Sequence, residues 1–541
     1  MITNKIFHPT SDEYDLNMAF FKWLFEKNNI ELHYEEDPVP LVRKPLIYYP
    51  KELKDLFETF PMQRLKKILQ LSKFIDNNSN ALHTRYEHSL GVYNLKRQII
   101  LQQFVDNPEF KKYVEQNDLK LNLIAELIKS AGHDIGHLPL SHSLESSVIQ
   151  KPGFHEEIGK RILLENEQIQ SCLSNISPKL PHVFQDTLEH NYFGFNFLDE
   201  GNYDIEEVTE FIQTYLPRKE DRDLAFNGKP EYKKFEPFKL LKSKDAKSSF
   251  IPVFDISSID SIEEFLNLRV MAYKDFYYHP MTEIRDKSTA LVIKKALETN
   301  EPNGTNLQQF LVKLKNIHSA NDVNLDEWLS WNDLRFYNEL LNIAEFSENK
   351  ALQKAAIFSV PGLDQLLDIS AKMLDLKNTS NQLTPNENAF LKRLHKYITE
   401  KNDFTRALSD FNYWDKCIKY TTNPQKVRKL QASSNLPIEF YTHTIVGYNP
   451  KEPIFFQTED GKIYTYDAIP NRTPKVGSDK ITLDIAFCFL PFLGEPTQSN
   501  VEIGSTLNEK RQTSFGIPYF NRPSPAGTYI ENTMKKIDEE R

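Results

Sequence analysis

Cysteine is scarce in this chain of 541 residues. Its three cysteines, Cys172, Cys417 and Cys488, lie far apart and form no CxxC motif. So few thiols at such distances exclude a disulfide framework. This usage is typical of a protein kept in a reducing compartment, and we predict a cytoplasmic location.

Long hydrophobic runs and an excess of positive charge are also missing. No stretch approaches the roughly 18 apolar residues of a membrane span, and the segment 1–5 leads into no apolar region of the kind found in signal peptides. Acidic residues outnumber basic ones by 76 to 66, which gives a net charge of −10. We therefore expect no membrane association and no bulk binding of nucleic acid.

The composition is otherwise that of an ordinary globular protein, with 40% hydrophobic and 26% charged residues. Apolar residues recur at helical spacing along most of the chain, which predicts a mainly α fold. After about residue 436 the pattern favours short strands, with a hairpin turn at 459–462. The predicted organisation is a peripheral segment (1–45), a core (46–300), a helical continuation (301–435) and a smaller C-terminal α+β region with a tail (436–541).

One segment, SAGHDIGHLPLSHSLE at 130–145, gathers histidines and carboxylates. A helix ending near residue 131 would carry the neighbouring His133 and Asp134, and both could reach one ion. Imidazole and carboxylate groups are common ligands of divalent metals. On a continuous helix, His137 would share a face with His133, because four residues separate them.

Two glycines, Gly132 and Gly136, flank this histidine–aspartate pair. Because glycine has no side chain, we expect these positions to let an ion or a phosphate come close to the backbone.

A second motif, HTRYEHSLGV at 83–92, lies upstream of the segment 130–145. Together the two motifs resemble those of the HD-domain phosphohydrolases, and within them those of the deoxynucleoside-triphosphate triphosphohydrolases. The resemblance covers roughly residues 46–345. It implies a helical HD core and one divalent ion held by His88, His133, Asp134 and a fourth carboxylate. The sequence does not distinguish Mn, Mg, Fe, Ni and Zn.

The fourth ligand is harder to place. The segment 219–228, KEDRDLAFNG, resembles a shortened version of the family motif that contains this ligand. Either Asp221 is the metal ligand, or Arg222 and Asp223 match a later Arg-Asp pair near the substrate and the metal aspartate is missing. We favour Asp221; the rival candidates are Asp204, Asp223, Asp255 and Asp260.

The resemblance also implies substrate-binding residues. Gln70 and Leu71, at the end of a predicted helix over 63–71, would line the sugar and the base. Arg269 and Tyr277, on a long helix starting near residue 258 with Asp260 as its cap, would contact the triphosphate and the sugar.

A triphosphate is strongly anionic, so positive charge has to gather locally in this acidic chain. Arg85 and His137 would neutralise phosphate charge, and a guanidinium suits bidentate phosphate contacts. The other candidate cations are Lys66, Arg269 and Lys274.

Proton transfer is predicted for His142, Glu145 and His155. His142 and Glu145 are three residues apart, and His155 opens the next predicted helix, where it could meet Glu145. A histidine steered by a carboxylate suits proton transfer near neutral pH.

The resemblance implies hydrolysis of deoxynucleoside triphosphates to deoxynucleoside and inorganic triphosphate, in a homo-oligomer with a nucleotide activator. Two alternatives stay open. One is hydrolysis of another phosphate ester, such as a nucleoside monophosphate or a cyclic or signalling nucleotide. The other is a non-catalytic nucleotide sensor. The incomplete match of the segment 219–228 to the family motif suggests this alternative.

Overall fold

The structure is a computed structural model. It describes residues 10–36, 46–71, 82–190, 193, 238–242, 250–273, 278, 280–298, 306–376, 383–400, 404, 418–421, 425, 427–428, 439–446, 454–470 and 480–489.

Helices dominate this part of the chain, and the fold is mainly α, as predicted. An N-terminal group comprises α1 (Ser11–Phe25), α2 (Lys51–Phe57), α3 (Phe60–Arg64), α4 (Arg85–Asp106), α5 (Pro108–Gln116), α6 (Lys120–Gly132), α7 (His142–Leu144), α8 (Phe154–Glu165), α9 (Glu167–Ile176) and α10 (Leu180–Glu189). The later helices are α13 (Ile259–Ala272), α14 (Pro280–Glu298), α15 (Asn306–Lys315), α16 (Leu325–Leu329), α17 (Asp333–Phe346), α18 (Lys350–Ser359), α19 (Leu363–Met373) and α20 (Pro385–Thr399).

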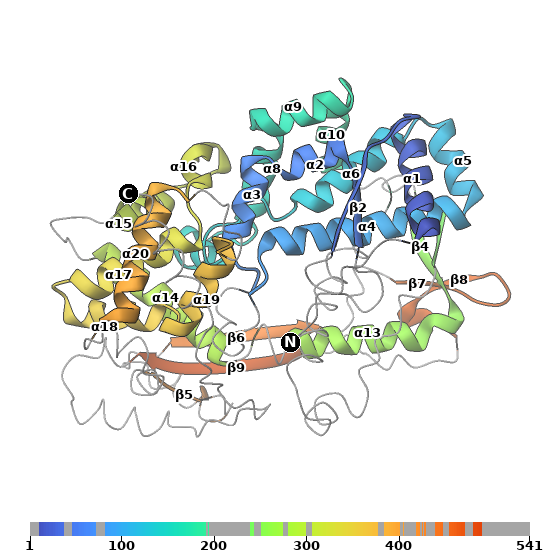
Figure 1. The fold of residues 1–541 in the computed structure, drawn as a ribbon. Helices are drawn as coiled ribbons and strands as arrows, with labels where there is room; N and C mark the ends of the chain where they lie inside the picture. The colour runs from blue at the N-terminus through green and yellow to red at the C-terminus, as the bar shows by residue number, and fades with distance from the viewer. Residues whose placement is uncertain are drawn as a thin grey trace.

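Helix α4 begins at a capping box. The hydroxyl of Thr84 accepts from the backbone N–H of Glu87, and the carboxylate of Glu87 accepts from the backbone N–H of Thr84. These bonds satisfy N–H groups that a helix start leaves without partners. Most of α4 is buried, and it packs along α6 (Figure 1). Because α4 and α6 are adjacent, the sequence segments 83–92 and 130–145 lie close together.

The predicted helix over 63–71 is wrong in its second half. Helix α3 ends at Arg64, a 3-10 turn follows (η1, Leu65–Lys67), and the chain then pairs with the segment before α4. A bridge joins Leu69 to Thr84, and the N–H of Gln70 donates to the carbonyl of His83. The apolar spacing suited a helix, but pairing with a distant segment overrides local periodicity here.

Within the described residues, strands form three small sheets. One pairs β1 (Leu32–Glu36) with β2 (Leu46–Pro50). The second has the order β3-β4-β7-β8, from β3 (Phe238–Lys242), β4 (Phe250–Asp255), β7 (Phe455–Gln457) and β8 (Ile463–Thr465). The third has the order β5-β9-β6, from β5 (Ile418–Thr421), β9 (Lys480–Phe489) and β6 (Glu439–Val446).

The C-terminal strands join the core. Strand β7 runs parallel to β4, and the predicted hairpin turn at 459–462 connects β7 to β8. The buried hydroxyl of Tyr466 donates to Glu263 of α13. Asp260 lies in the first turn of α13 and is not its cap; Ser258 occupies that position. Residues of this hairpin region, including Phe456, belong to the same hydrophobic cluster as the helices.

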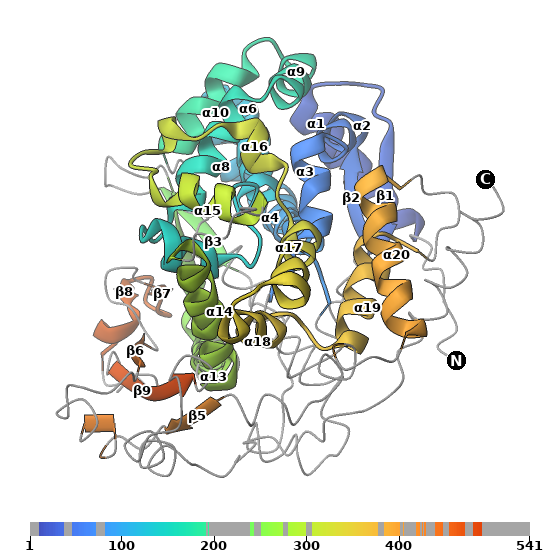
Figure 2. The same ribbon diagram turned by 90° about the vertical axis from the view of Figure 1, so that its left-hand side faces the viewer.

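The later helices close over the N-terminal group. Figure 1 and Figure 2 both show α16 beside α3. The guanidinium of the buried Arg64 donates from Nε to the carbonyl of Trp331 (2.9 Å), in the turn before α17. This packing puts the start of α17 against the loop that follows α6, which carries the predicted metal ligands. No helix in the described ranges has the length and apolar character needed to cross a membrane.

Candidate metal centre

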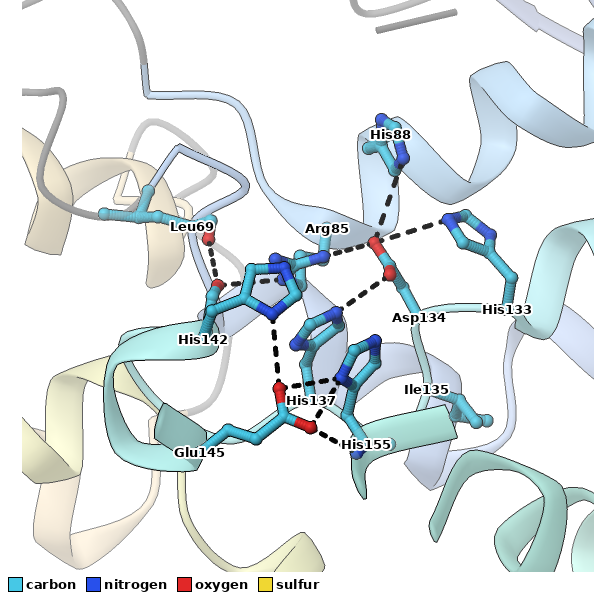
Figure 3. Close-up of polar contacts among 12 residues, drawn as sticks. Leu69, Arg85, His88, His133, Asp134, Ile135, His137, His142, Glu145 and His155 are labelled. Carbon is cyan, nitrogen blue, oxygen red and sulfur yellow. Dashed lines mark hydrogen bonds and ion pairs between the residues drawn. The ribbon is translucent and has the colours of Figure 1, made fainter. Parts of the chain in front are cut away.

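Three predicted metal ligands come together where α4 and α6 meet (Figure 3). His88 lies in the first turns of α4, His133 caps the end of α6, and Asp134 follows it. The Oδ2 atom of Asp134 lies 3.5 Å from Nε2 of His133 and 3.8 Å from Nε2 of His88. One ligand atom from each residue lies within 4.8 Å of the other two, so the trio could hold a single ion.

The hydrogen bonding of His133 fits a metal ligand. Its Nδ1 lies 2.8 Å from the carbonyl of Ser130. A carbonyl only accepts, so Nδ1 carries a proton, and this bond turns Nε2 toward the carboxylate of Asp134. Fixing of the ring by its second nitrogen is usual for metal-binding histidines.

The carboxylate of Asp134 is ionised. Burial alone raises its pKa, but the charges of Arg85, His133 and His137 outweigh burial and hold the pKa well below its ordinary value. Nη1 of Arg85 lies 2.5 Å from Oδ2, and Nε of Arg85 donates to Ser141 at 3.0 Å. The buried guanidinium of Arg85 is thus already paired within the protein, and its predicted contact with phosphate remains a prediction.

A second cluster contains the residues predicted for proton transfer. Glu145 starts a π-helical turn (η3, Glu145–Ile149), a type of turn that is frequent at functional sites. Its carboxylate lies 3.2 Å from Nδ1 of His142 and 3.0 Å from Nδ1 of His155, so the predicted contacts are confirmed. Burial raises the pKa of Glu145, but its hydrogen bonds with the two histidines outweigh burial and lower the pKa well below its ordinary value. An ionised Glu145 makes both Nδ1 atoms donors and leaves each Nε2 to exchange protons.

His137 connects the two clusters. Its Nε2 lies 3.1 Å from Oδ1 of Asp134, and its ring stacks on that of His155 with centroids 3.8 Å apart. Burial first, and then the charge of Arg85, lower the pKa of His137 well below its ordinary value. The predicted role of His137 in neutralising phosphate charge stays a prediction.

The expectation that His133 and His137 share a helical face is wrong. Helix α6 ends at Gly132, and turns follow from there, closed by bonds such as His137 N–H to the carbonyl of Asp134 (3.1 Å). The two histidines consequently approach different oxygens of Asp134.

The two glycines serve helix packing and not the approach of an ion. A Cβ on Gly136 would lie 2.0 Å from the carbonyl oxygen of His155 and 2.5 Å from the backbone nitrogen of Gly159. A Cβ on Gly132 would lie 2.8 Å from the side chain of Leu163. Helix α8 fills the space beside both glycines, and this close approach brings His155 to Glu145.

The predicted substrate residues are only partly placed. Gln70 and Leu71 lie half-buried just after the bridge at Leu69, beside the start of α4. Arg269, on α13, lies over the ring of Tyr273 at 5.9 Å. Within the described ranges, no polar or ring contact joins Arg269 to either histidine cluster. The remaining predicted residues of this kind, Tyr277 and Lys274, lie outside the described residues.

Five aspartates were candidates for the fourth metal ligand. Asp204, Asp221 and Asp223 lie outside the described residues. Of the described candidates, Asp255 caps a 3-10 turn through Ser257 N–H, and Asp260 is exposed. Neither belongs to the ligand groups found in the described part of the chain.

Sequence reasoning missed a set of buried residues that support the site: Arg64, Ser141 and Asp333. Asp333 lies among large apolar residues in the segment WNDLRFY, which also contains Asn332 and Arg335, so the sequence carries only a weak signal for it.

Comparisons with known proteins found relatives over part of the chain and a solved structure with a similar fold. No protein-family model matches the chain. The chain is 25% identical over 252 residues to the uncharacterized protein YwfO of Bacillus subtilis, covering 46% of the chain and 53% of YwfO, so it spans about half of that relative's length. It is 36% identical over 119 residues to a putative HD domain-containing protein of Acanthamoeba polyphaga mimivirus, covering 20% of the chain and 26% of that protein.

A further relative is the deoxynucleoside triphosphate triphosphohydrolase SAMHD1 homolog of Dictyostelium discoideum, 35% identical over 111 residues and covering 20% of each chain. The crystal structure of a phosphohydrolase from Bacteroides thetaiotaomicron has a similar fold, with a TM-score of 0.50, 18% identity, and coverage of 85% of this chain and 100% of that one. Together these similarities support an HD-type phosphohydrolase.

Proposed function

We propose that this protein is a metal-dependent hydrolase of deoxynucleoside triphosphates that releases deoxynucleoside and inorganic triphosphate. One observation carries the proposal. A potential metal trio, His88, His133 and Asp134, stands beside a histidine pair oriented by Glu145. The partial similarity to the Dictyostelium triphosphohydrolase supports this substrate class.

The reaction replaces the bond from the α-phosphorus to O5′ of the sugar by a bond to a water oxygen. Water loses one proton and O5′ gains one, so no redox partner is needed. A divalent ion held by the trio would act as a Lewis acid that polarises a phosphate oxygen and favours ionisation of water.

The protein's own groups manage the protons. Because Glu145 holds Nδ1 of His142 and His155 as donors, the Nε2 atom of either ring can take a proton as a base or give one as an acid. The side chain of His142 is 67% exposed and that of His155 only 14%, so the pair offers one solvent-facing and one sheltered group. The exposed His142 suits contact with an entering nucleotide.

The proposal is tested with purified protein, each of the four deoxynucleoside triphosphates, and Mn²⁺ or Mg²⁺. We expect inorganic triphosphate and deoxynucleoside in equal amounts, and no product after chelation of the metal. Phosphate release only from monophosphates or cyclic nucleotides would replace this function with the hydrolysis of another ester. Tight nucleotide binding without product would replace it with a sensor. Size measurement with and without nucleotide tests the expected homo-oligomer and activator.

A further inference from the structure

A buried carboxylate binds two backbone segments of the candidate site that are distant from it in the sequence. Asp333, at the start of α17, has no exposed surface. Its Oδ2 accepts from the backbone N–H of Leu69 and its Oδ1 from that of Leu140, both at 2.8 Å. These two acceptor bonds join segments that are otherwise remote in sequence.

Each of these backbone groups lies next to a predicted functional residue. Leu69 precedes Gln70, which is predicted to line the nucleotide. Leu140 and Ser141 precede His142, and both have positive φ angles, 56° and 52°. Side-chain-bearing residues rarely adopt this conformation, so it persists only where surrounding contacts enforce it. The bond from Asp333 to the N–H of Leu140 is such a contact.

Further hydrogen bonds connect the segments around Leu69 and Leu140. The hydroxyl of Ser141 donates to the carbonyl of Leu69 at 3.4 Å and accepts from Nε of Arg85 at 3.0 Å. Arg64 runs alongside: its Nη2 donates to the carbonyl of His137 at 2.6 Å and its Nε to that of Trp331 at 2.9 Å. The loop between His137 and His142 is thus tied at both ends to the start of α17.

We propose that Asp333 is a positioning residue, which sets the left-handed turn at Leu140 and Ser141 and thereby the place of His142 relative to Gln70. The inference rests on the proposed function, because it names how the same site is held ready. Asp333 itself touches no reacting atom; it acts through the backbone of the two segments it joins.

The test variant is Asp333→Asn. Asparagine keeps the shape, but its single oxygen accepts from one N–H, and its amide group turns a donor toward the other. Glu345→Gln is the matched control. Glu345 lies near the other end of the same helix, where one carboxylate oxygen accepts from Arg393 and Tyr397, both at 2.8 Å. It has no described contact with either histidine cluster.

Both variants are assayed where circular dichroism shows them fully folded, and rates are normalised to bound metal. We expect kcat of Asp333→Asn to fall about tenfold or more and KM to rise, since small misplacements near a reacting group are costly. Glu345→Gln should stay within twofold of wild type in both constants. A merely structural role would lower only the active fraction and leave both normalised constants of Asp333→Asn near wild type, which would overturn the proposal.

A second readout needs no activity. Amide hydrogen exchange at Leu69 and Leu140 should speed up in Asp333→Asn and not in Glu345→Gln; unchanged exchange would also overturn the proposal. If the wild type cleaves another phosphate ester and no deoxynucleoside triphosphate, the proposed substrate is wrong, and the same constants measured on that ester decide the role of Asp333. If it cleaves no ester, both ideas fail.

Discussion

Glu145 and His155 are joined twice. Both the backbone N–H and the ring Nδ1 of His155 donate to the Glu145 carboxylate, at 3.0 Å each. The backbone bond satisfies an N–H in the first turn of α8, and the ring bond orients the imidazole. One carboxylate therefore places both the helix and its histidine.

This double contact makes Glu145→Gln informative. Glutamine has one acceptor oxygen for the three N–H groups that face this carboxylate, so at least one of them loses its acceptor. We expect kcat to fall about 10²- to 10⁴-fold, the usual range for lost acid–base function, with metal content unchanged. The exposed pair His190 and Asp186 provides a control: Asp186→Asn should leave kcat unaltered. Loss of metal in Glu145→Gln would contradict the separation of the two clusters.

Asp134→Ala should remove the metal and the activity together. Asp134 faces both ligand histidines and also pairs with Arg85, so alanine leaves a buried guanidinium without its partner. We expect metal, measured by elemental analysis, to fall below a tenth of the wild-type amount, and turnover to become undetectable. An Asp134→Ala protein that keeps full activity would refute the site assignment.

The two glycines should respond differently to alanine. In Gly136→Ala the new methyl group meets backbone atoms of α8, which cannot rotate away. In Gly132→Ala it meets only the side chain of Leu163. We expect a loss of unfolding free energy of about 3 kcal/mol or more for Gly136→Ala and about 1 kcal/mol for Gly132→Ala, from the usual cost of overpacking. Urea denaturation measures both, and equal losses would speak against the close contact at Gly136.

Asp333 should give stability a pH dependence of unusual sign. Burial raises its pKa to about 6 from an ordinary 3.8, although the N–H groups of Leu69 and Leu140 and the charges of Arg85 and Arg64 oppose the shift. The folded protein therefore binds this proton more tightly than the unfolded chain does. This group's contribution to stability falls as pH rises from about 4 to 6, by about 3 kcal/mol in total.

The difference between wild type and Asp333→Asn isolates that contribution. Between pH 7 and pH 5, wild type should gain about 1 kcal/mol of unfolding free energy relative to Asp333→Asn, because only part of the titration lies in this range. Denaturant titrations at both pH values provide the measurement. A difference that does not change with pH would show that Asp333 is already ionised, or already protonated, throughout.

Local patterns predicted much of the site. Apolar spacing before the His133–Asp134 pair predicted a helix ending close to residue 131, and α6 ends at Gly132. The spacing of His142 and Glu145 predicted their contact, and the position of His155 at a helix start predicted its meeting with Glu145. Such features depend on helical geometry over a few residues, which short segments encode.

Other features were beyond local patterns. The chain after Lys67 leaves its helical pattern to pair with the segment before α4. Glycine permits several uses, and only the position of α8 shows that Gly136 serves packing. Leu140 and Ser141 adopt left-handed backbone angles although neither is a glycine, so the sequence carries no signal of this conformation.

By itself, then, the sequence determined the residue types of the candidate site, the helices that carry them and the mainly α class, because periodicity and short motifs act over one or two turns. Only the tertiary structure decided that Asp333, 264 residues beyond Leu69, joins the segments around Leu69 and Leu140. The reason is physical: a buried carboxylate takes whichever N–H groups the packing of α17 brings to it, and no local pattern records that packing.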